Sequence, residues 1–269
     1  MADRFLVTGC ASGIGLRVAE MLAQRGHRVL ATDIRHEAVE AEAGRWDRER
    51  VRTAALDVTS PDAWTRVLDE AWSAWGGLDV LYNIAGYLMP GWVQAIDLRD
   101  VDRHIDINTK GVMYGTHLAA RRMVEQGSGH IVNIASMAAH APVPGLALYS
   151  ASKYAVRAFS LAAAVELREH GVAVTVVCPD AVATPMLDKQ KDYEEAALTF
   201  TAPRVLSAEE VAAHLVGHVL ERRPLETSLP RSRKWLAKLA DILPEAALWA
   251  KPLFQKQGRA AQARARRRR

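Results

Sequence analysis

The chain has 269 residues, of which 49% are hydrophobic and 25% are charged, and its formal net charge is +4. Such a composition is that of a soluble globular protein with enough apolar material for a core, and it excludes fibrous and disordered classes. The two cysteines, Cys10 and Cys178, are far apart and have no cysteine or histidine at metal-ligand spacing beside them, so we expect no disulfide framework, no metal and a reducing compartment.

No apolar run approaches the roughly 18 residues of a membrane span, and the first residues lack the pattern of a secretory signal. We therefore expect a cytoplasmic protein. The charge is uneven along the chain: residues 231–269 contain twelve lysines and arginines and two acidic residues, whereas the first 230 residues contain 23 basic and 29 acidic residues. The basic character thus belongs to the end of the chain and says little about the ligand of the folded domain.

Short β-rich runs alternate with longer helical patterns up to about residue 230, which predicts one doubly wound α/β domain, residues 1–230, with a parallel sheet and helices on both faces. Seven strands are expected, at residues 5–8, 28–33, 52–57, 78–83, 130–134, 173–178 and 225–229. Helices are expected to begin near Gly13, His36, Pro61, Arg99, Tyr149 and Ser207. Two carry start signals: Ser60 precedes Pro61 as a cap, and Ser207 with Glu210 has the spacing of a capping box.

Residues 231–269 differ in character, and we expect them to form a helical extension. An amphipathic segment covers residues 234–243, Pro244 breaks it, a second segment covers residues 246–254, and residues 264–269 are nearly all arginine. We expect the final residues to be disordered, because a run of like charges repels itself and buries nothing. Apolar side chains beside lysines and arginines predict that the extension docks on an apolar surface: its own domain, a neighbouring subunit, the substrate mouth or an anionic membrane.

A glycine-rich turn follows the first expected strand, with Gly9, Gly13 and Gly15 between that strand and the first helix. Glycines there let the backbone approach a dinucleotide pyrophosphate, which would rest on the amides and the positive dipole end of the helix. Asp33 ends the second strand, 18 residues after Gly15, close to the spacing at which a carboxylate meets the adenosine ribose hydroxyls. A glycine-rich turn alone could be an ordinary loop, but together with Asp33 it predicts a dinucleotide site.

The spacing Gly-x-x-x-Gly-x-Gly and the motifs after it resemble the short-chain dehydrogenase/reductase family over residues 5 to about 230. The shared motifs stand in the family's order: the glycine turn, Asp57-Val58, Asn83-Ile-Ala-Gly86, Asn108, Ser136 and Tyr149-Ser-Ala-Ser-Lys153. The resemblance implies a Rossmann fold and an NAD(P)-dependent oxidoreductase. It also implies that the cofactor is contacted by Gly9, Ser12, Gly13, Ile14, Gly15, Asp33, Asp57, Val58, Asn83, Ala85, Gly86, Tyr149, Lys153, Pro179, Val182 and Thr184.

Two positions depart from the family's pattern. Ile84 stands where a second asparagine is usual, so the hydrogen bonds of that asparagine must be absent or replaced. Asp180 stands where glycine is usual after Pro179. Its carboxylate either lies near the nicotinamide or the substrate mouth, or points to solvent from a backbone conformation that glycine would adopt more easily.

Tyr149 and Lys153 are four residues apart at the start of a helical pattern, so their side chains share one face. An ammonium there would stabilise a tyrosine phenolate and lower its pKa, which a tyrosine needs in order to act as a base at neutral pH. Such pairs are common on helix surfaces by chance, but Ser136, at the carboxyl edge of the expected sheet, accompanies this one. By the resemblance, Tyr149 transfers the proton, Lys153 also holds the nicotinamide ribose and Ser136 holds the substrate oxygen. Asn108 would position a proton-relay water, unless it merely bonds the backbone locally.

The segments that form the substrate walls in this family are here residues 87–92, 137–148 and 186–200. They are largely apolar and hold no arginine cluster for a phosphate or carboxylate, which favours a hydrophobic secondary alcohol or ketone of steroid, retinoid or long-chain type. Asp33 favours NAD(H), because a 2′-phosphate would bring negative charge against its carboxylate. Arg35 could neutralise that phosphate, but we expect the chain to turn there and leave Arg35 exposed.

We therefore predict an NAD(H)-dependent alcohol dehydrogenase or ketoreductase that forms a homodimer or homotetramer. An NADPH-dependent ketoreductase and a non-catalytic dinucleotide-sensing protein are the alternatives, and the latter would not need Tyr149, Lys153 and Ser136 together. The arginine tail suggests at most salt-sensitive, non-specific contact with nucleic acid, because no base-reading motif is present. His214 and His218 could chelate a metal from one helix face but lack a third ligand, so an exposed pair is expected.

Overall fold

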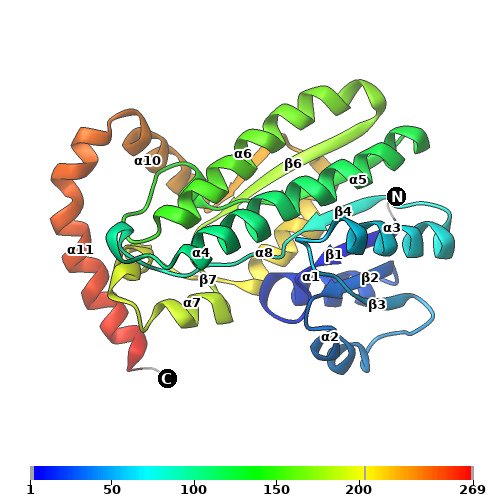
Figure 1. Cartoon of the computed structure of the whole chain (residues 1–269), viewed down its shortest axis with the longest axis horizontal. Coiled ribbons are helices and arrows are strands. Elements are labelled where there is room, and N and C mark those ends of the chain that lie inside the picture. The colour runs from blue at the N-terminus through cyan, green and yellow to red at the C-terminus, as the bar shows by residue number, and fades with distance from the viewer. Residues whose placement is uncertain (1–2, 203, 268–269) are drawn as a thin grey trace.

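The computed structural model describes residues 3–202 and 204–267. Its centre is a seven-stranded sheet with the order β3-β2-β1-β4-β5-β6-β9, in which neighbouring strands pair in parallel (Figure 1). The strands are β1 Arg4–Thr8, β2 Arg28–Asp33, β3 Val51–Ala55, β4 Val80–Asn83, β5 Gly129–Ile134, β6 Val172–Pro179 and β9 Glu226–Leu229. The predicted doubly wound Rossmann sheet is therefore confirmed. Its strand order reverses between β1 and β4, which is where such folds bind their ligands.

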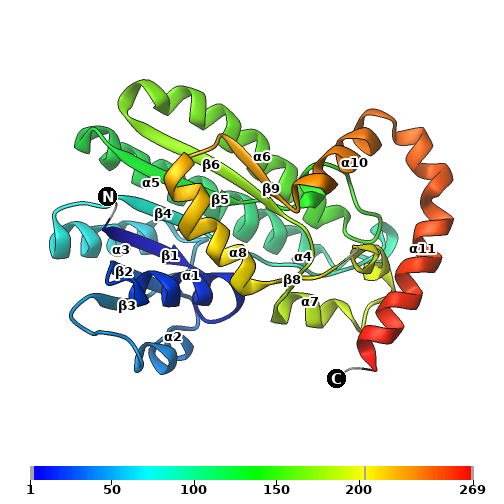
Figure 2. The same cartoon turned by 180° about the vertical axis from the view of Figure 1, so that it is seen from behind.

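Helices cover both faces of the sheet (Figures 1 and 2). They are α1 Gly13–Gln24, α2 His36–Ala43, α3 Pro61–Trp75, α4 Leu98–Arg103, α5 Gly111–Gln126, α6 Ala147–Leu167, α7 Pro185–Gln190, α8 Ala208–His214 and α9 Leu220–Arg222. Phe5 and Val7 of β1 share an apolar cluster with α1 and α8, whereas Leu6 between them belongs to the cluster of α3, α5 and α6. Because successive side chains of a strand point to opposite faces, each apolar strand supplies both halves of the core.

Local signals in the sequence set the beginnings of two helices as predicted. Ser60 caps α3 with its hydroxyl oxygen, which accepts a backbone N–H at 3.2 Å. Ser207 and Glu210 form the capping box of α8. A π-helical segment, His104–Lys110, joins α4 to α5, and the continuous helix that results carries Asn108.

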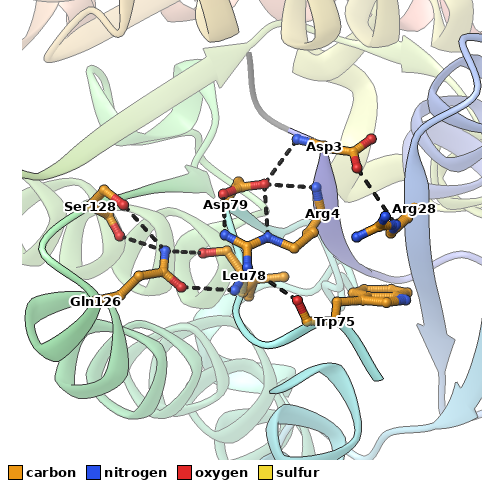
Figure 3. A network of polar contacts seen from close by, with 8 residues as sticks. All are labelled: Asp3, Arg4, Arg28, Trp75, Leu78, Asp79, Gln126 and Ser128. Atoms are coloured by element: carbon orange, nitrogen blue, oxygen red, sulfur yellow. Dashed lines mark hydrogen bonds and ion pairs between the residues drawn. The ribbon is translucent and has the colours of Figure 1, made fainter. Parts of the chain in front are cut away.

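The amino edge of the sheet, opposite the ligand edge, is held by polar contacts between β1, the start of β4 and the end of α5 (Figure 3). The Arg4 guanidinium forms a two-point ion pair with Asp79, at 2.7 Å and 3.1 Å, and the same carboxylate accepts the backbone N–H groups of Asp3 and Arg4. Burial opposes ionisation of Asp79, but these contacts hold its pKa below the ordinary value. The Gln126 side chain exchanges two hydrogen bonds with the Leu78 backbone. The three elements are thus fixed at the edge that carries no predicted site residue.

The chain after β6 forms a lid beside the sheet, and we use that name for residues 184–202. A small ribbon, in which β7 Val182–Ala183 pairs with β8 Leu206–Ser207, holds the two ends of the lid. The lid itself contains α7 and a 3₁₀ segment, Glu194–Thr201. Two further helices, α10 Arg231–Ile242 and α11 Pro244–Arg266, form the extension, and α11 runs along the 3₁₀ segment (Figures 1 and 2).

α11 is clamped to the lid by buried contacts on its inner face. The Gln262 side chain is buried and donates hydrogen bonds to the carbonyl oxygens of Gln190 and Tyr193, at 2.9 Å and 2.6 Å. One turn earlier, Gly258 packs so closely that a Cβ would lie 2.2 Å from the carbonyl oxygen of Ala197. The glycine and the glutamine therefore join the end of the chain to the lid.

The predicted helical extension is confirmed, and α11 continues to Arg266. The Gln262 contacts hold the helix from its inner face while most of its described arginines remain exposed. The disorder expected for the final residues stays a prediction. Arg266 itself donates to the carbonyl oxygen of Lys191. Residues 268 and 269, which the same prediction covered, lie outside the described residues.

Candidate active site

The carboxyl ends of the central strands bring together turns that are far apart in the sequence. Gly9, after β1, packs against the turn after β4, where a Cβ on Gly9 would lie 3.0 Å from Ala85 N and Cα. Gly13 packs against the loop after β6, where its Cβ would lie 3.1 Å from Thr184 Cγ2. The predicted pyrophosphate, ribose and nicotinamide segments therefore form one continuous site at the carboxyl edge of the sheet.

The glycine turn has the shape and the donors that a dinucleotide phosphate requires. Gly9 and Gly13 adopt φ values of +77° and +60°, a left-handed conformation that other residues rarely take. Gly15 lies against the carbonyl oxygen of Gly9, only 2.3 Å from where its Cβ would be. Ser12 precedes α1 and makes no side-chain cap hydrogen bond, so the first-turn N–H groups face the site without a side-chain cap. Ile14 packs on the apolar core beneath the turn.

Asp33 is fixed by backbone amides at the end of β2. Its two carboxylate oxygens accept the N–H groups of Ala11 and Arg35, at 3.0 Å and 2.9 Å, and its side chain is 11% exposed. Arg35 is exposed, as predicted, but its guanidinium turns back: Nε lies 3.8 Å from Asp33, and one terminal nitrogen lies 3.5 Å from Ser12 Oγ. A carboxylate and a cation thus lie together where the adenosine ribose is expected.

Asp57 and Val58 form the turn after β3. Asp57 Oδ1 accepts hydrogen bonds from the backbone N–H and the hydroxyl of Thr59, at 2.9 Å and 2.7 Å. Val58 is buried against the start of α5, where a Cβ on Gly111 would lie 2.9 Å from Val58 Cγ2. Packing of this kind fixes the turn beside the glycine loop and leaves the second oxygen of Asp57 for a ligand.

The turn after β4 is held by Thr8, whose hydroxyl oxygen accepts the N–H groups of Ile84 and Ala85 at 2.9 Å and 3.0 Å. The Asn83 side chain points away from this turn into the protein, where it donates to Asn133 Oδ1 at 2.8 Å. Any contact of Asn83 with a cofactor must therefore come from its backbone. Ile84 packs on the apolar core, so apolar contact replaces the hydrogen bonds of the asparagine that the family usually has there.

Ser136, Tyr149 and Lys153 come together as predicted. Ser136 lies close enough to Tyr149 to lower the pKa of its hydroxyl. Lys153 is buried, lies with Nζ 5.7 Å from the centre of the Tyr149 ring, and donates to the carbonyl oxygen of Ile134 at 2.8 Å. The end of β5 therefore orients the lysine through the Ile134 carbonyl group. The spacing of one turn of α6 places the lysine beside the tyrosine.

Burial dominates the pKa values of this pair. Burial raises the pKa of Tyr149 to about 12, although the nearby Ser136 side chain opposes the shift. Burial also lowers the pKa of Lys153 to about 8. Removal from water thus favours the neutral form of both groups. The expectation that Lys153 and the oxidised nicotinamide together lower the pKa of Tyr149 stays a prediction.

Asn108 connects the turn after β4 to the catalytic helix. Its side-chain oxygen accepts the Tyr87 N–H at 2.7 Å, and its amide nitrogen donates to Tyr87 O at 2.8 Å and to Ser152 Oγ at 3.0 Å. These partners are distant in the sequence, so the local backbone bonding considered above is wrong. Gly86 leaves room beside them, since a Cβ there would lie 3.3 Å from Asn108 Oδ1 and 3.8 Å from Lys153 Nζ.

Asp180 does not point to solvent, which was one of the two alternatives considered from the sequence, and a place near the nicotinamide or the substrate mouth stays a prediction. Its carboxylate is 11% exposed and lies 3.0 Å from Nε of Arg233, a residue of α10, and its backbone φ is not positive. Burial raises the pKa of Asp180, and the Arg233 charge opposes that shift. Next to it, Val182 is buried in β7, and Thr184 donates to the Val182 carbonyl oxygen at 3.3 Å. Pro179, which ends β6, and this loop are therefore tied to the extension.

An apolar cluster surrounds the reacting side of Tyr149. It is built from all three predicted substrate-wall segments: Leu88, Leu146 and Ala196 are buried, and Val143, Met186 and Tyr149 pack against them. Tyr149 thus has apolar side chains from each of these three segments beside it.

His104 was not singled out by the sequence, although it holds one of these walls. It is buried in the π-helical segment, with Nδ1 2.6 Å from the carbonyl oxygen of Asp100, and Nε2 accepts the Met89 N–H at 3.3 Å. Burial lowers the pKa of His104, so the neutral ring can donate at one nitrogen and accept at the other. A lone histidine in a helix pattern gives no sign of such a contact.

A second unpredicted group consists of His140, Cys178 and Glu226, whose potential ligand atoms lie within 4.8 Å of one another. The Glu226 carboxylate already binds two cations, Arg157 at 2.5 Å and Lys234 at 2.7 Å. Burial raises the pKa of Cys178 to about 12 and lowers that of His140 to about 4. A neutral thiol beside two cations is a poor ligand set for a metal ion, so we interpret the group as the anchor of α10 on β9.

The histidine pair of the α8 region is half-buried rather than exposed. The His214 and His218 rings stack at 5.0 Å, and His214 Nε2 lies 3.1 Å from Thr227 Oγ1. Within the described part of the chain, no group of three potential metal ligands includes either histidine. The pair therefore packs α8 against β9.

Comparison with known proteins agrees with this geometry, since residues 4–195 match the family model of the short chain dehydrogenases. The chain belongs to the short-chain dehydrogenase family. It is thus an oxidoreductase of a family that uses NAD or NADP. The match ends inside the lid, so the extension lies outside it. In the described residues, no helix is both long and apolar enough to cross a membrane.

Two similar proteins are hydroxysteroid dehydrogenases. The 3-beta-hydroxysteroid dehydrogenase of Comamonas testosteroni is 40% identical over 187 residues, which cover 68% of this chain and 72% of that protein. The 3-alpha-(or 20-beta)-hydroxysteroid dehydrogenase of Mycobacterium tuberculosis is 37% identical over 183 residues, covering 68% and 70%. Among solved structures, gox2181 has the same fold, with a TM-score of 0.77 at 24% identity over 85% of this chain and 94% of that one. A putative gluconate dehydrogenase from Agrobacterium tumefaciens gives a TM-score of 0.71 at 26% identity, covering 80% and 87%.

Proposed function

We propose that this dehydrogenase transfers hydride between NAD(H) and a hydrophobic secondary alcohol or ketone, with Tyr149 as the proton-transfer residue. The observation that carries the proposal is the apolar cluster of Leu88, Leu146, Ala196 and their neighbours around Tyr149. An apolar substrate gains about 25 cal/mol for each Å² buried against such walls. A polar substrate would lose hydration without finding partners there.

The residues at the carboxyl edge fit a dinucleotide. A side chain at Gly9 or Gly15 would clash with the backbone of Ala85 or of Gly9 itself, so glycines are needed to form the turn on which its phosphates would lie, and the first turn of α1 has no side-chain cap. Asp33 would hold the adenosine ribose, and Tyr149 and Lys153 the nicotinamide ribose. The nicotinamide, when bound, accepts or supplies the hydride. The remaining contacts would come from Ser12, Gly13, Ile14, Asp57, Val58, Asn83, Ala85, Gly86, Pro179, Val182 and Thr184.

The proton moves through Tyr149. In ketone reduction its hydroxyl donates to the carbonyl oxygen, which the Ser136 hydroxyl also binds, and in alcohol oxidation the proton returns to the Tyr149 oxygen. The raised pKa keeps the donor form present at neutral pH. Oxidation requires the phenolate, which the Lys153 ammonium stabilises from beside the ring. Asn108 acts by holding the Tyr87 backbone and the Ser152 hydroxyl in place.

The relatives support a rigid polycyclic alcohol as the substrate class. Both named relatives are hydroxysteroid dehydrogenases, and the walls around Tyr149 present the hydrocarbon that a steroid skeleton would contact. The homo-oligomeric state and the cytoplasmic location expected from the sequence stay predictions.

A cofactor-reduction screen tests the proposal. NAD⁺ is supplied with 3β-, 3α- and 20β-hydroxysteroids, a long-chain secondary alcohol and a small polyol, and we expect kcat/KM for the apolar substrates to be about tenfold or more above that for the polyol. Preference for the polyol would contradict the substrate class. NADH binding without turnover of any alcohol would instead support the dinucleotide-sensing alternative.

The Tyr149→Phe variant tests the proton-transfer step. Its kcat should fall by about 10²- to 10⁴-fold, because the transferable proton is lost, while NADH affinity, measured by fluorescence titration, stays within about twofold. Tyr114→Phe is the matched control, since Tyr114 packs on the core around α3 and α5 and should be neutral. Near-normal turnover by Tyr149→Phe would overturn the mechanism.

A further inference from the structure

α10 is amphipathic in the reverse sense, with its charged side chains against the protein and its apolar side chains toward solvent. Three contacts fix this orientation: Arg233 with Asp180 at 3.0 Å, Lys234 with Glu226 at 2.7 Å, and the Tyr154 hydroxyl with Asp241 at 2.7 Å. A surface helix normally buries its apolar stripe on its own domain. The expected docking of the extension on its own domain therefore uses the polar side of α10, and the large apolar side chains of the other side are each more than half exposed.

The apolar side is one continuous stripe. Trp235, Leu239 and Ile242 follow the spacing of a single helix face, and Trp235 and Ile242 are both 73% exposed. Leu236 and Leu243 adjoin the stripe and are also exposed. We call these five residues the outer face of α10. On α11, Leu253 is 71% exposed and Phe254 is 41% exposed, which adds hydrocarbon to the same extension.

Cations border the outer face. Lys238 lies with Nζ 5.9 Å from the centre of the Trp235 ring, and Arg231 precedes Trp235 by one helical turn. On α11, Lys256 and Arg264 are exposed. The extension as a whole holds twelve basic and two acidic residues, whereas residues 1–230 carry more acidic than basic side chains. Apolar surface bordered by cations is complementary to an anionic lipid surface.

We propose that the extension docks on an anionic lipid surface, with the outer face of α10 in the headgroup boundary and Arg231, Lys238, Lys256 and Arg264 on lipid phosphates. A second copy of the chain is the competing occupant. A two-fold contact through the outer face would bring two strongly basic extensions together, and their repulsion disfavours it.

Docking would place the lid, which the extension holds, beside the lipid surface. Arg233 and Gln262 join the extension to the lid, with Arg233 3.5 Å from the carbonyl oxygen of Thr201 and Gln262 bonded to Gln190 and Tyr193. An apolar alcohol dissolved in the bilayer would then be close to the walls around Tyr149. This last step rests on the proposed function, whereas the docking itself does not.

Vesicle flotation of the full-length protein tests the docking without substrate or turnover. We expect the protein to float with vesicles of phosphatidylcholine and phosphatidylglycerol about tenfold more than with phosphatidylcholine alone, and raised salt should reduce the bound fraction. The double variant Leu239→Glu/Ile242→Glu should lose binding by about tenfold or more. Leu98→Glu is the matched control, because Leu98 is 79% exposed on α4 and should bind as the wild type does.

The charge contribution is tested separately by Lys238→Glu/Lys256→Glu, which should weaken binding to anionic vesicles and leave the thermal unfolding temperature unchanged. Failure of the wild type to float with anionic vesicles would overturn the proposal. So would an oligomer, measured by sedimentation velocity, that Leu239→Glu/Ile242→Glu dissociates while flotation is absent, because the second copy would then be the occupant. If flotation succeeds and none of the apolar alcohols of the screen is turned over, the docking stands and the proposed function fails.

Discussion

Asp180 shows at the residue scale how a departure from a family pattern is explained by a distant partner. A carboxylate there would be costly to bury alone, and Arg233 of the extension compensates its charge. Sequence spacing predicted Tyr149, Lys153, Ser136 and the glycine turn, because each follows a strand or shares a helix turn. It could not predict Asp180 or His104, since their roles depend on contacts between elements that spacing does not reveal.

Cofactor preference depends on two neighbouring residues. Asp33 should favour NAD(H) over NADP(H) in kcat/KM by about tenfold to several-hundredfold, because like charges at contact distance cost about 1 to 4 kcal/mol. Arg35, whose guanidinium lies 3.8 Å from Asp33, should reduce that preference. Steady-state kinetics with both cofactors are expected to show a smaller ratio in Asp33→Ala and a larger one in Arg35→Ala. A wild-type ratio near one would mean that Arg35 outweighs Asp33.

At the scale of elements, hydrophobic pattern predicted the strands and helices well, and their ends less well. The third strand was expected to reach Asp57 but ends at Ala55, because Asp57 instead closes a turn with Thr59. The π-helical segments could not be predicted, since side-chain periodicity does not distinguish them from α-helix over one turn. The side of α10 that contacts the protein was predicted wrongly for another reason. The apolar stripe of α10 suggested that the stripe would be buried, whereas the charged residues make the contacts.

The junction of β9 and α10 should be sensitive to acid. Burial of Glu226 favours its neutral form, but Arg157 and Lys234 lower its pKa to about 2. Because the folded pKa lies below the ordinary value, the stabilisation is present above about pH 4.5 and is lost as the pH falls from there toward 2. Glu226→Gln should thus lower the free energy of unfolding by up to about 3 kcal/mol at pH 7, and by progressively less below pH 4.

Denaturant unfolding at several pH values measures that difference. Glu221→Gln, at an exposed position of α9, is the control and should change stability little at any pH. Burial lowers the pKa of His140, and the charge of Glu226, 3.3 Å away, raises it, so the measured difference also contains the loss of this contact at acid pH. A stability difference that does not vary between pH 7 and pH 3 would contradict the assignment.

The contact of α11 with the lid can be tested through a glycine. Gly258→Ala places a Cβ 2.2 Å from the carbonyl oxygen of Ala197, so we expect a loss of about 1 to 3 kcal/mol and a raised KM as the lid loosens. Gly217→Ala is the matched control, because Gly217 also lies in a helix and has no atom within 4 Å of its added Cβ. The thermal unfolding temperature and the KM of both variants test this prediction. Equal values in the two variants would contradict the close contact.

On the scale of the whole molecule, the chain divides into an acidic Rossmann domain and a basic extension. The division was visible in the sequence, because composition changes sharply near residue 230. The extension's position was not, since nothing in its own pattern indicates that it lies along residues 184–202. The family pattern covers the catalytic domain and ends within that lid. The contacts of α11 that hold the lid therefore could not be expected from the family pattern, and only the tertiary structure shows them.

Removing residues 231–269 should leave a folded but weakened enzyme. All seven strands of the sheet precede the cut, whereas Asp180 and Glu226 lose Arg233 and Lys234. We expect a thermal unfolding temperature lower by several degrees and a KM raised about fivefold or more, with kcat less affected because Tyr149 stays in place. Removing only residues 267–269 is the control. An unchanged KM in the longer truncation would show that the extension does not hold the lid.

Gln262, which clamps the lid, follows the sheet and α6 in the chain, and this order affects how the enzyme folds during synthesis. Because a chain is synthesised from its amino end and its earlier parts fold first, the sheet and the catalytic helix emerge from the ribosome before the clamp does. A nascent chain can therefore form the sheet and α6 before it can form the contacts that hold its lid. We expect a chain that lacks Gln262 to form its sheet but to hold its lid less firmly.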